Sequence, residues 1–70
     1  MRAGVTRFWD YDGGWGVVDS DANSGGCWVH FSAVHREGYR YLTEGEPVRF
    51  EFVAAAVREY KYRAVAVYPC

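Results

Sequence analysis

Apolar and polar residues alternate along much of this chain with a period of two. Between Pro47 and Val53, the apolar residues Val48, Phe50 and Phe52 recur at every second position, which is the period of a β-strand. Other short runs rich in Val, Tyr, Phe and Trp are separated by segments rich in Gly and Asp, as turns separate strands. The pattern predicts five strands, over residues 3–10, 15–18, 27–31, 47–53 and 61–68.

The intervening segments have the composition of turns and loops. We expect a turn at Asp10–Gly14, a loop at Asp19–Gly26, an irregular segment at His35–Gly45, and a strand end followed by a loop at Ala54–Glu59. Ser32–Val34 is expected to form one helical turn with Ser32 as its N-cap. Five short strands predict an all-β fold, a five-stranded antiparallel barrel, because closure removes the exposed edges of an open sheet.

The length of 70 residues leaves room for a single domain over residues 1–70. A chain of this size buries only about 60% of its unfolded surface, so the core is thin. No apolar run approaches the ~18 residues of a membrane span, and the N-terminus opens no secretory signal. We therefore expect a cytoplasmic protein without membrane contact, and neither a multi-domain enzyme nor a deeply enclosed active site.

The two cysteines give little indication of function. Cys27 and Cys70 are too few for the disulfide framework of a small secreted domain, so reduced thiols are favoured, with one disulfide left open. Cys27 is followed by His30 and His35, but strand alternation places Cys27 and His30 on opposite faces. We therefore expect no metal and no cofactor.

Aromatic residues make up 19% of the chain, more than a thin core needs. Alternation in the second and third strands separates small apolar side chains from large rings. If the small ones, Val18, Cys27 and Val29, fill the core, the solvent face carries Trp15, Val17, Trp28 and His30. Cross-strand neighbours lie about 5 Å apart, so these rings would form one platform. Flat exposed rings suit stacked bases, although a lone Trp is more often a core residue.

Net charge limits how such a platform holds nucleic acid. The formal net charge is −1, and all four Asp residues fall within residues 10–21. Proteins that bind phosphates through bulk charge usually carry a basic excess. Any nucleic acid must therefore be held by more than charge.

Two motifs carry a resemblance to a known family. Gly14-Trp15-Gly16-Val17-Val18 resembles the first ribonucleoprotein motif of the bacterial cold-shock proteins, and residues 27–34, Cys-Trp-Val-His-Phe-Ser-Ala-Val, resemble the second. Gly4–Asp10 resembles the opening strand of that family, and Glu37–Arg40 the loop after the second motif. The resemblance extends over almost the whole chain.

The resemblance implies an OB-type barrel that binds single-stranded RNA or DNA without catalysis. We expect such a protein to act as an RNA chaperone, and we expect a monomer. The family's surface rings correspond to Phe8, Trp15, Trp28, His30, Phe31 and Tyr39, with Trp9 adjoining. The expected nucleic-acid-binding set comprises these rings with neighbouring positions: Arg7, Phe8, Trp15, Val17, Trp28, His30, Phe31, Tyr39, Arg40, Lys61 and Arg63.

Several positions depart from the family pattern. Val17 replaces a second aromatic residue, Gly13 replaces a Lys, and Asp10 replaces an Asn. Tyr62-Arg63-Ala64 stands where the family has Gly-Pro-Gln. Fewer cations and more negative charge predict weaker phosphate contacts. Either Lys61 and Arg63, or the Trp rings that replace Phe at positions 15 and 28, would offset this loss.

Two other functions are alternatives to nucleic-acid binding. Catalysis by Ser32 and His30 is not expected, because no orienting acid lies nearby in the sequence. A protein-interaction module is the stronger alternative, since exposed Trp, Tyr and Arg are typical of protein interfaces.

Overall fold

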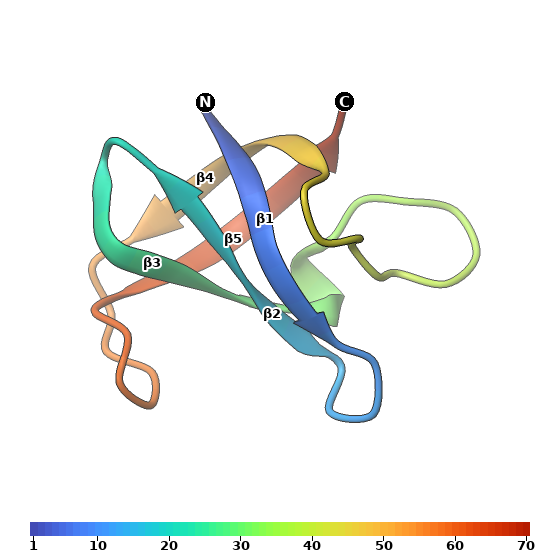
Figure 1. Ribbon diagram of the computed structural model, residues 1–70, viewed down its shortest axis with the longest axis horizontal. Coiled ribbons are helices and arrows are strands. Elements are labelled where there is room, and N and C mark those ends of the chain that lie inside the picture. The colour runs from blue at the N-terminus through green and yellow to red at the C-terminus, as the bar shows by residue number, and fades with distance from the viewer.

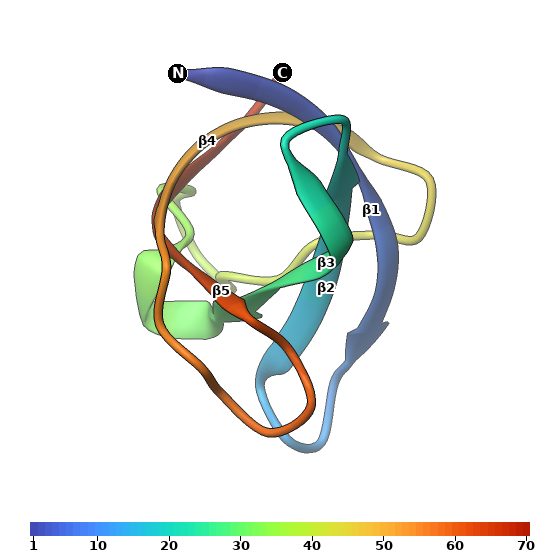
Figure 2. The same ribbon diagram turned by 90° about the vertical axis from the view of Figure 1, so that its left-hand side faces the viewer.

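The computed structural model describes residues 1–70 as five strands and one 3₁₀ turn. The elements are β1 (Arg2–Asp10), β2 (Trp15–Ser20), β3 (Asn23–His30), η1 (Phe31–Ala33), β4 (Pro47–Val53) and β5 (Tyr62–Pro69). The strands close into a barrel in the order β1-β2-β3-β5-β4, and the closed ring is seen in Figure 2. The predicted all-β, five-stranded barrel is confirmed. No helix has the length and apolar character that crossing a membrane requires.

One strand pairing departs from the antiparallel prediction. β3 and β5 run parallel and pair through Cys27 with Tyr62 and Trp28 with Arg63, whereas every other neighbouring pair is antiparallel. Strand directions cannot alternate all the way round a closed ring with an odd number of strands. The five-stranded barrel therefore needs one parallel seam, and the long connection through η1 and β4 brings β5 back in the direction of β3 (Figure 1).

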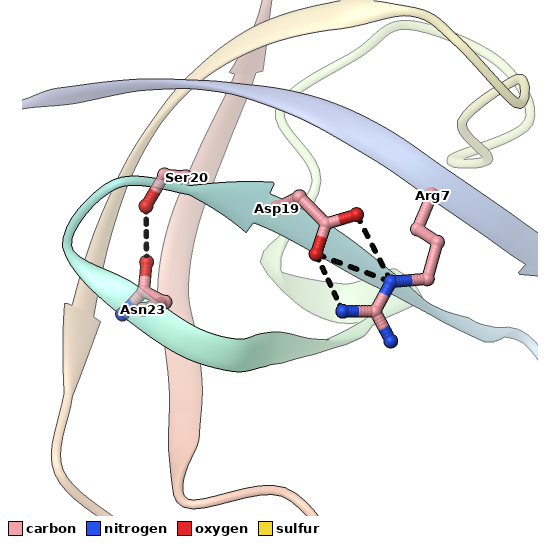
Figure 3. Close-up of polar contacts among 4 residues, drawn as sticks. All are labelled: Arg7, Asp19, Ser20 and Asn23. Carbon is pink, nitrogen blue, oxygen red and sulfur yellow. Dashed lines mark hydrogen bonds and ion pairs between the residues drawn. The ribbon is translucent and has the colours of Figure 1, made fainter.

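The predicted loop over Asp19–Gly26 is wrong, because β2 and β3 continue to a tight turn at residues 21–22. Ser20 Oγ donates to Asn23 Oδ1 at 2.6 Å across this turn (Figure 3). Gly26 lies inside β3 with a φ of 99°. A Cβ there would lie 2.7 Å from Val17 and 2.8 Å from the Arg7 guanidinium. The glycine that indicated a loop is thus needed for close packing within a strand.

The other connections match the prediction more closely. The helical turn after β3 is confirmed, and residues 35–45 form no helix or strand. Residues 54–61 connect β4 to β5 and include a turn in which Val57 and Tyr60 exchange two backbone hydrogen bonds of 2.9 Å.

Side chains from all five strands fill the interior of the barrel. The buried cluster contains Trp9, Val18, Cys27, Val29, Val34, Leu42, Val48, Phe50, Ala64 and Val67. The core positions predicted for Val18, Cys27 and Val29 are confirmed. Trp9, expected beside the surface rings, belongs instead to the core. Both cysteines are free, and burial raises the pKa of the Cys27 thiol to about 12.

Candidate nucleic-acid interface

Five rings from three strands and η1 form a continuous row on the outside of the barrel. Phe8 of β1 meets Trp15 of β2 edge-on, with ring centroids 5.3 Å apart. Trp15 stacks on Trp28 of β3 at 6.5 Å, and Trp28 stacks on His30 at 5.8 Å. His30 contacts Phe31 of η1 at 4.4 Å. We call these five residues the ring row.

The strand register explains why the row is continuous, and it also corrects one predicted site residue. Val17 of β2 lies opposite Phe8 on β1 and opposite Trp28 on β3. Because larger side chains flank it on both sides, Val17 is 0% exposed, and its predicted exposure to solvent is wrong. Trp15 and Trp28 lie outside the core and are half-buried. Val17 therefore underlies the row as packing and has no surface of its own to offer a ligand.

His30 is held in place by the turn that follows it. Its Nδ1 accepts a hydrogen bond from the Ser32 backbone N–H at 3.3 Å and lies 2.7 Å from Ser32 Oγ. His30, and not Ser32 as predicted, is thus the N-cap of η1. The cap fixes the plane of the imidazole against Trp28 and Phe31. The Ser32–His30 contact serves this cap, and no carboxylate hydrogen-bonds to either side chain.

The predicted phosphate contact Arg7 is engaged within the protein. Its guanidinium donates to both carboxylate oxygens of Asp19 on β2, at 2.5 to 3.1 Å (Figure 3). The hydrogen bonds to Asp19 raise the pKa of Arg7, and those from Arg7 lower the pKa of Asp19. The pair neutralises the basic position beside Phe8. The pairing of Arg7 with Asp19 could not be predicted from the sequence, because it depends on the register between β1 and β2.

Arg58 is a second interface residue that sequence reasoning missed. It lies in the Val57–Tyr60 turn, and its guanidinium carbon is 4.5 Å from the centroid of the Trp15 ring. Its φ is 56°, the only positive φ of a non-glycine residue in the chain. A cation over an indole face gains about 0.5–1 kcal/mol at an exposed site. No local pattern predicts this contact, since the two residues lie on separate elements far apart in sequence.

The β1–β2 turn explains two departures from the family pattern. Asp10 Oδ1 accepts hydrogen bonds from the backbone N–H groups of Asp12 and Gly13, at 3.1 and 2.9 Å. The Asp10 carboxylate thus shapes the turn, as predicted for a turn former. A Cβ at Gly13 would lie 2.7 Å from the Trp15 indole. The larger ring at position 15 therefore occupies the space that a side chain at position 13 would need.

A pocket of about 460 Å³ opens next to the Phe31 end of the ring row. We call it the tyrosine pocket; its lining residues are Trp9, Tyr11, Gly14, Phe31, Tyr39, Arg40 and Tyr41. Tyr39 and Arg40 were predicted as site residues, and Tyr39 is 86% exposed. Tyr11 and Tyr41 were not predicted. Their rings contact each other with centroids 5.5 Å apart.

Two further predicted cations, Lys61 and Arg63, lie at the end of the β4–β5 connection and at the start of β5. Arg63 pairs with Trp28 across the parallel seam, so both side chains leave the sheet on the same face. Lys61 lies two residues earlier and is exposed, as is Arg63. No three His, Cys, Asp or Glu side chains gather closely enough to hold a metal ion. The arrangement offers flat apolar rings with a few exposed cations beside them, which is chemistry suited to the stacking of bases.

Comparison with known proteins identifies relatives of this chain. The family model of the 'Cold-shock' DNA-binding domain matches residues 2–70. Cold shock protein CspA of Staphylococcus saprophyticus is 36% identical over 53 residues, which cover 76% of this chain and 79% of that protein. Cold shock protein CspA of Staphylococcus epidermidis has the same identity and coverage. The protein of that name from Staphylococcus aureus strain USA300 is 34% identical over 53 residues, with the same coverage.

Proposed function

This chain belongs to the cold-shock DNA-binding domain family, whose general function is nucleic-acid binding, and from this premise we propose that its ring row stacks the unpaired bases of single-stranded RNA or DNA. The proposed role is that of a monomeric, cytoplasmic RNA chaperone. Rings that hold unpaired bases keep a strand from re-forming its own pairs. The proposed action needs no bond making, metal or cofactor.

The observation that carries the proposal is the continuity of the ring row. Five rings follow one another with centroids 4.4 to 6.5 Å apart, on a barrel whose core is filled by other side chains. Every base has a π-face, so such a row binds without reading base edges. Sequence-tolerant contacts suit a protein that acts on many transcripts. Lys61, Arg63 and Arg40 are exposed and would supply the phosphate contacts.

Tryptophan fluorescence tests the proposal directly. Short oligothymidine or oligouridine strands should quench the emission of Trp15 and Trp28 on titration. Loss of one stacking ring costs about 1–3 kcal/mol per base, so Trp28→Ala should weaken binding roughly 5- to 150-fold. Trp28→Phe is the matched control, because it keeps a ring and should bind nearly as tightly as the wild type.

A hairpin-melting assay tests the chaperone role separately. Saturating protein should lower the melting temperature of an RNA hairpin, because it binds only the opened strands. Quenching without hairpin destabilisation would leave binding but remove the chaperone role. No quenching by any strand in low salt would reject the proposal and favour the ring row as a protein-binding surface.

A further inference from the structure

One member of the ring row is titratable. Histidine ordinarily changes its charge between about pH 5 and pH 8, and His30 is the only residue of the row that can do so. We propose that His30 makes strand binding dependent on pH: in mild acid its imidazolium adds a positive charge to the ring row and contacts a phosphate, so single strands bind more tightly. This inference rests on the proposed function.

The turn after β3 determines which nitrogen of neutral His30 carries the hydrogen. A backbone N–H can only donate, so the Ser32 N–H at 3.3 Å requires a lone pair on Nδ1. The hydrogen of the neutral ring is therefore on Nε2. Nε2 has no hydrogen-bond partner within the protein and is not one of its buried, unpartnered polar atoms. A ligand can thus reach the N–H that the cap leaves free.

The same turn also accommodates the protonated ring. When Nδ1 takes up a proton, the Ser32 N–H loses its acceptor, but Ser32 Oγ lies 2.7 Å away and can accept from the new N–H. The ring centroid of His30 lies 5.8 Å from that of Trp28 and 4.4 Å from that of Phe31. A cation within about 6 Å of an aromatic centroid is attracted to the ring. The imidazolium therefore stays where the neutral imidazole lies, with a charged N–H at Nε2.

The elements that pack against His30 bring little charge to it. β3 and η1 contain no other charged or titratable side chain except the buried Cys27, and Asp19 of β2 is paired with Arg7. Asp10 of β1 lies opposite Trp15, which in turn lies opposite His30. Two strand spacings, about 10 Å, therefore separate this carboxylate from the histidine. At that distance it favours the imidazolium only weakly in physiological salt.

Three arginines lie beside other rings of the row or line the tyrosine pocket with Phe31: Arg40, Arg58 and Arg63. In the free protein these cations oppose a further positive charge on His30. The phosphates of a bound strand would remove this opposition and accept a charge-assisted hydrogen bond from Nε2. Strand binding and proton uptake should therefore favour each other to the same extent, because coupling between two binding events is reciprocal.

The affinity of an oligothymidine as a function of pH tests this inference, since thymine and the phosphodiester backbone keep their charge in mild acid. From about pH 8 to about pH 5.5, the wild type should bind roughly two- to five-fold more tightly. The slope of log K against log salt should steepen by about 0.7, the contribution of one phosphate. His30→Phe should lose both changes, because it keeps a ring without a charge.

Two variants separate the role of His30 from other effects of pH. His35→Gln is the matched control, because His35 is the second histidine and stacks on Tyr68 outside the ring row; it should retain both changes. The α-amino group of Met1 is common to all variants, so its titration cancels in the comparison. Ser32→Ala keeps the backbone N–H but removes the hydroxyl that accepts from protonated Nδ1. Its gain in affinity should therefore begin at a lower pH than in the wild type.

Calorimetry of the unmodified protein gives a readout that needs no variant. Strand binding at about pH 6.5, compared in two buffers of different ionisation enthalpy, should show net uptake of a fraction of a proton. Equal affinity in mild acid and mild base, or binding without proton uptake, would overturn the inference and leave the ring row intact. A pH dependence that His30→Phe retains would also overturn it. If no strand quenches Trp15 and Trp28 in the wild type at any pH, the proposed function itself fails.

Discussion

Individual rings of the interface differ in how freely they can meet a base. Trp15 has Phe8 at its edge, Trp28 beside it and the Arg58 guanidinium over its face. Trp28 has no cation over it, and Arg63 is its neighbour across the seam. A base that stacks on the covered face of Trp15 must displace Arg58. Trp28 is therefore the ring that we expect to contribute most to binding in the first encounter.

Replacing Arg58 separates its two effects on binding. In Arg58→Ala, the face of Trp15 is uncovered before the ligand arrives, and a cation near the strand is lost. Displacing an exposed cation–π contact costs about 0.5–1 kcal/mol. At high salt, where phosphate attraction is screened, the variant should therefore bind oligothymidine about two- to five-fold more tightly.

A salt titration of the same pair of proteins provides the measurement. In low salt, the gain should shrink, because the lost charge then matters. Arg49→Ala is the control, since Arg49 is an exposed arginine on β4 outside the ring row. Weaker binding by Arg58→Ala at every salt concentration would mean that Arg58 holds the strand directly.

At the scale of strands and turns, the alternation of apolar and polar residues predicts well where a strand lies and which face a side chain is on. It predicts poorly how exposed that side chain is. The strand predicted over residues 47–53 matches β4, and Cys27 and Val29 lie in the core as expected. Alternation gives the face of Val17 but not its burial, which depends on Phe8 and Trp28 in neighbouring strands.

Contacts between distant elements account for the remaining differences. Arg7 is paired with Asp19 only because β1 and β2 lie side by side. The Arg58–Trp15 and Tyr11–Tyr41 contacts join a strand or turn to a remote loop. Local patterns contain no information about such contacts. All five rings of the ring row could therefore be predicted from the sequence and the family resemblance, whereas Arg58, Tyr11 and Tyr41 could not.

The contact between β1 and β2 predicts the effect of one substitution. A Cβ at Gly16 would lie 2.4 Å from the ring of Trp9 and 2.5 Å from the carbonyl oxygen of Phe8. Because Trp9 is a core residue and the oxygen belongs to the paired strand, neither can move freely. Gly16→Ala should therefore lower the free energy of unfolding by about 1–3 kcal/mol, the cost typical of overpacking. In a chain of this size, each kcal/mol lost lowers the Tm by about 4–8 °C.

Thermal unfolding followed by circular dichroism measures this loss. Gly38→Ala is the comparison, because a Cβ there meets no atom within 4 Å and only the positive φ of 76° is unfavourable. The Tm should fall further for Gly16→Ala than for Gly38→Ala. Equal losses would show that β1 and β2 separate easily, and that Trp9 does not constrain the strand beside it.

For the whole molecule, the distribution of charge matters more than its sum. The net charge is −1, and two of the arginines are paired internally, Arg7 with Asp19 and Arg36 with Glu46. The exposed cations beside the proposed interface are Arg40, Arg58, Lys61 and Arg63. Binding should therefore depend mainly on stacking, which salt hardly screens.

The dependence of affinity on salt measures this balance. Each phosphate neutralised on a single strand contributes about −0.7 to the slope of log K against log salt. For the wild type, we expect a slope that corresponds to about two or three neutralised phosphates. Asp19→Asn should release Arg7 and steepen the slope by about one phosphate. A wild-type slope equivalent to about six or more phosphates would mean that charge, and not the ring row, holds the strand.

The parallel seam of the barrel links ligand binding to the folding equilibrium. β3 and β5 are joined through only two residue pairs, one of which is Trp28 with Arg63. A strand that stacks on Trp28 and contacts Arg63 with its phosphate would span this seam, so it would bind the closed barrel and not an opened one. A ligand selective for the native state adds RT ln(1 + [L]/Kd) to stability, about 2.7 kcal/mol at a concentration of 100 Kd. Because the core of this domain is thin, the bound strand would contribute to stability much as an additional strand of the barrel does. The Tm of the protein would therefore rise and fall with the concentration of unpaired nucleic acid.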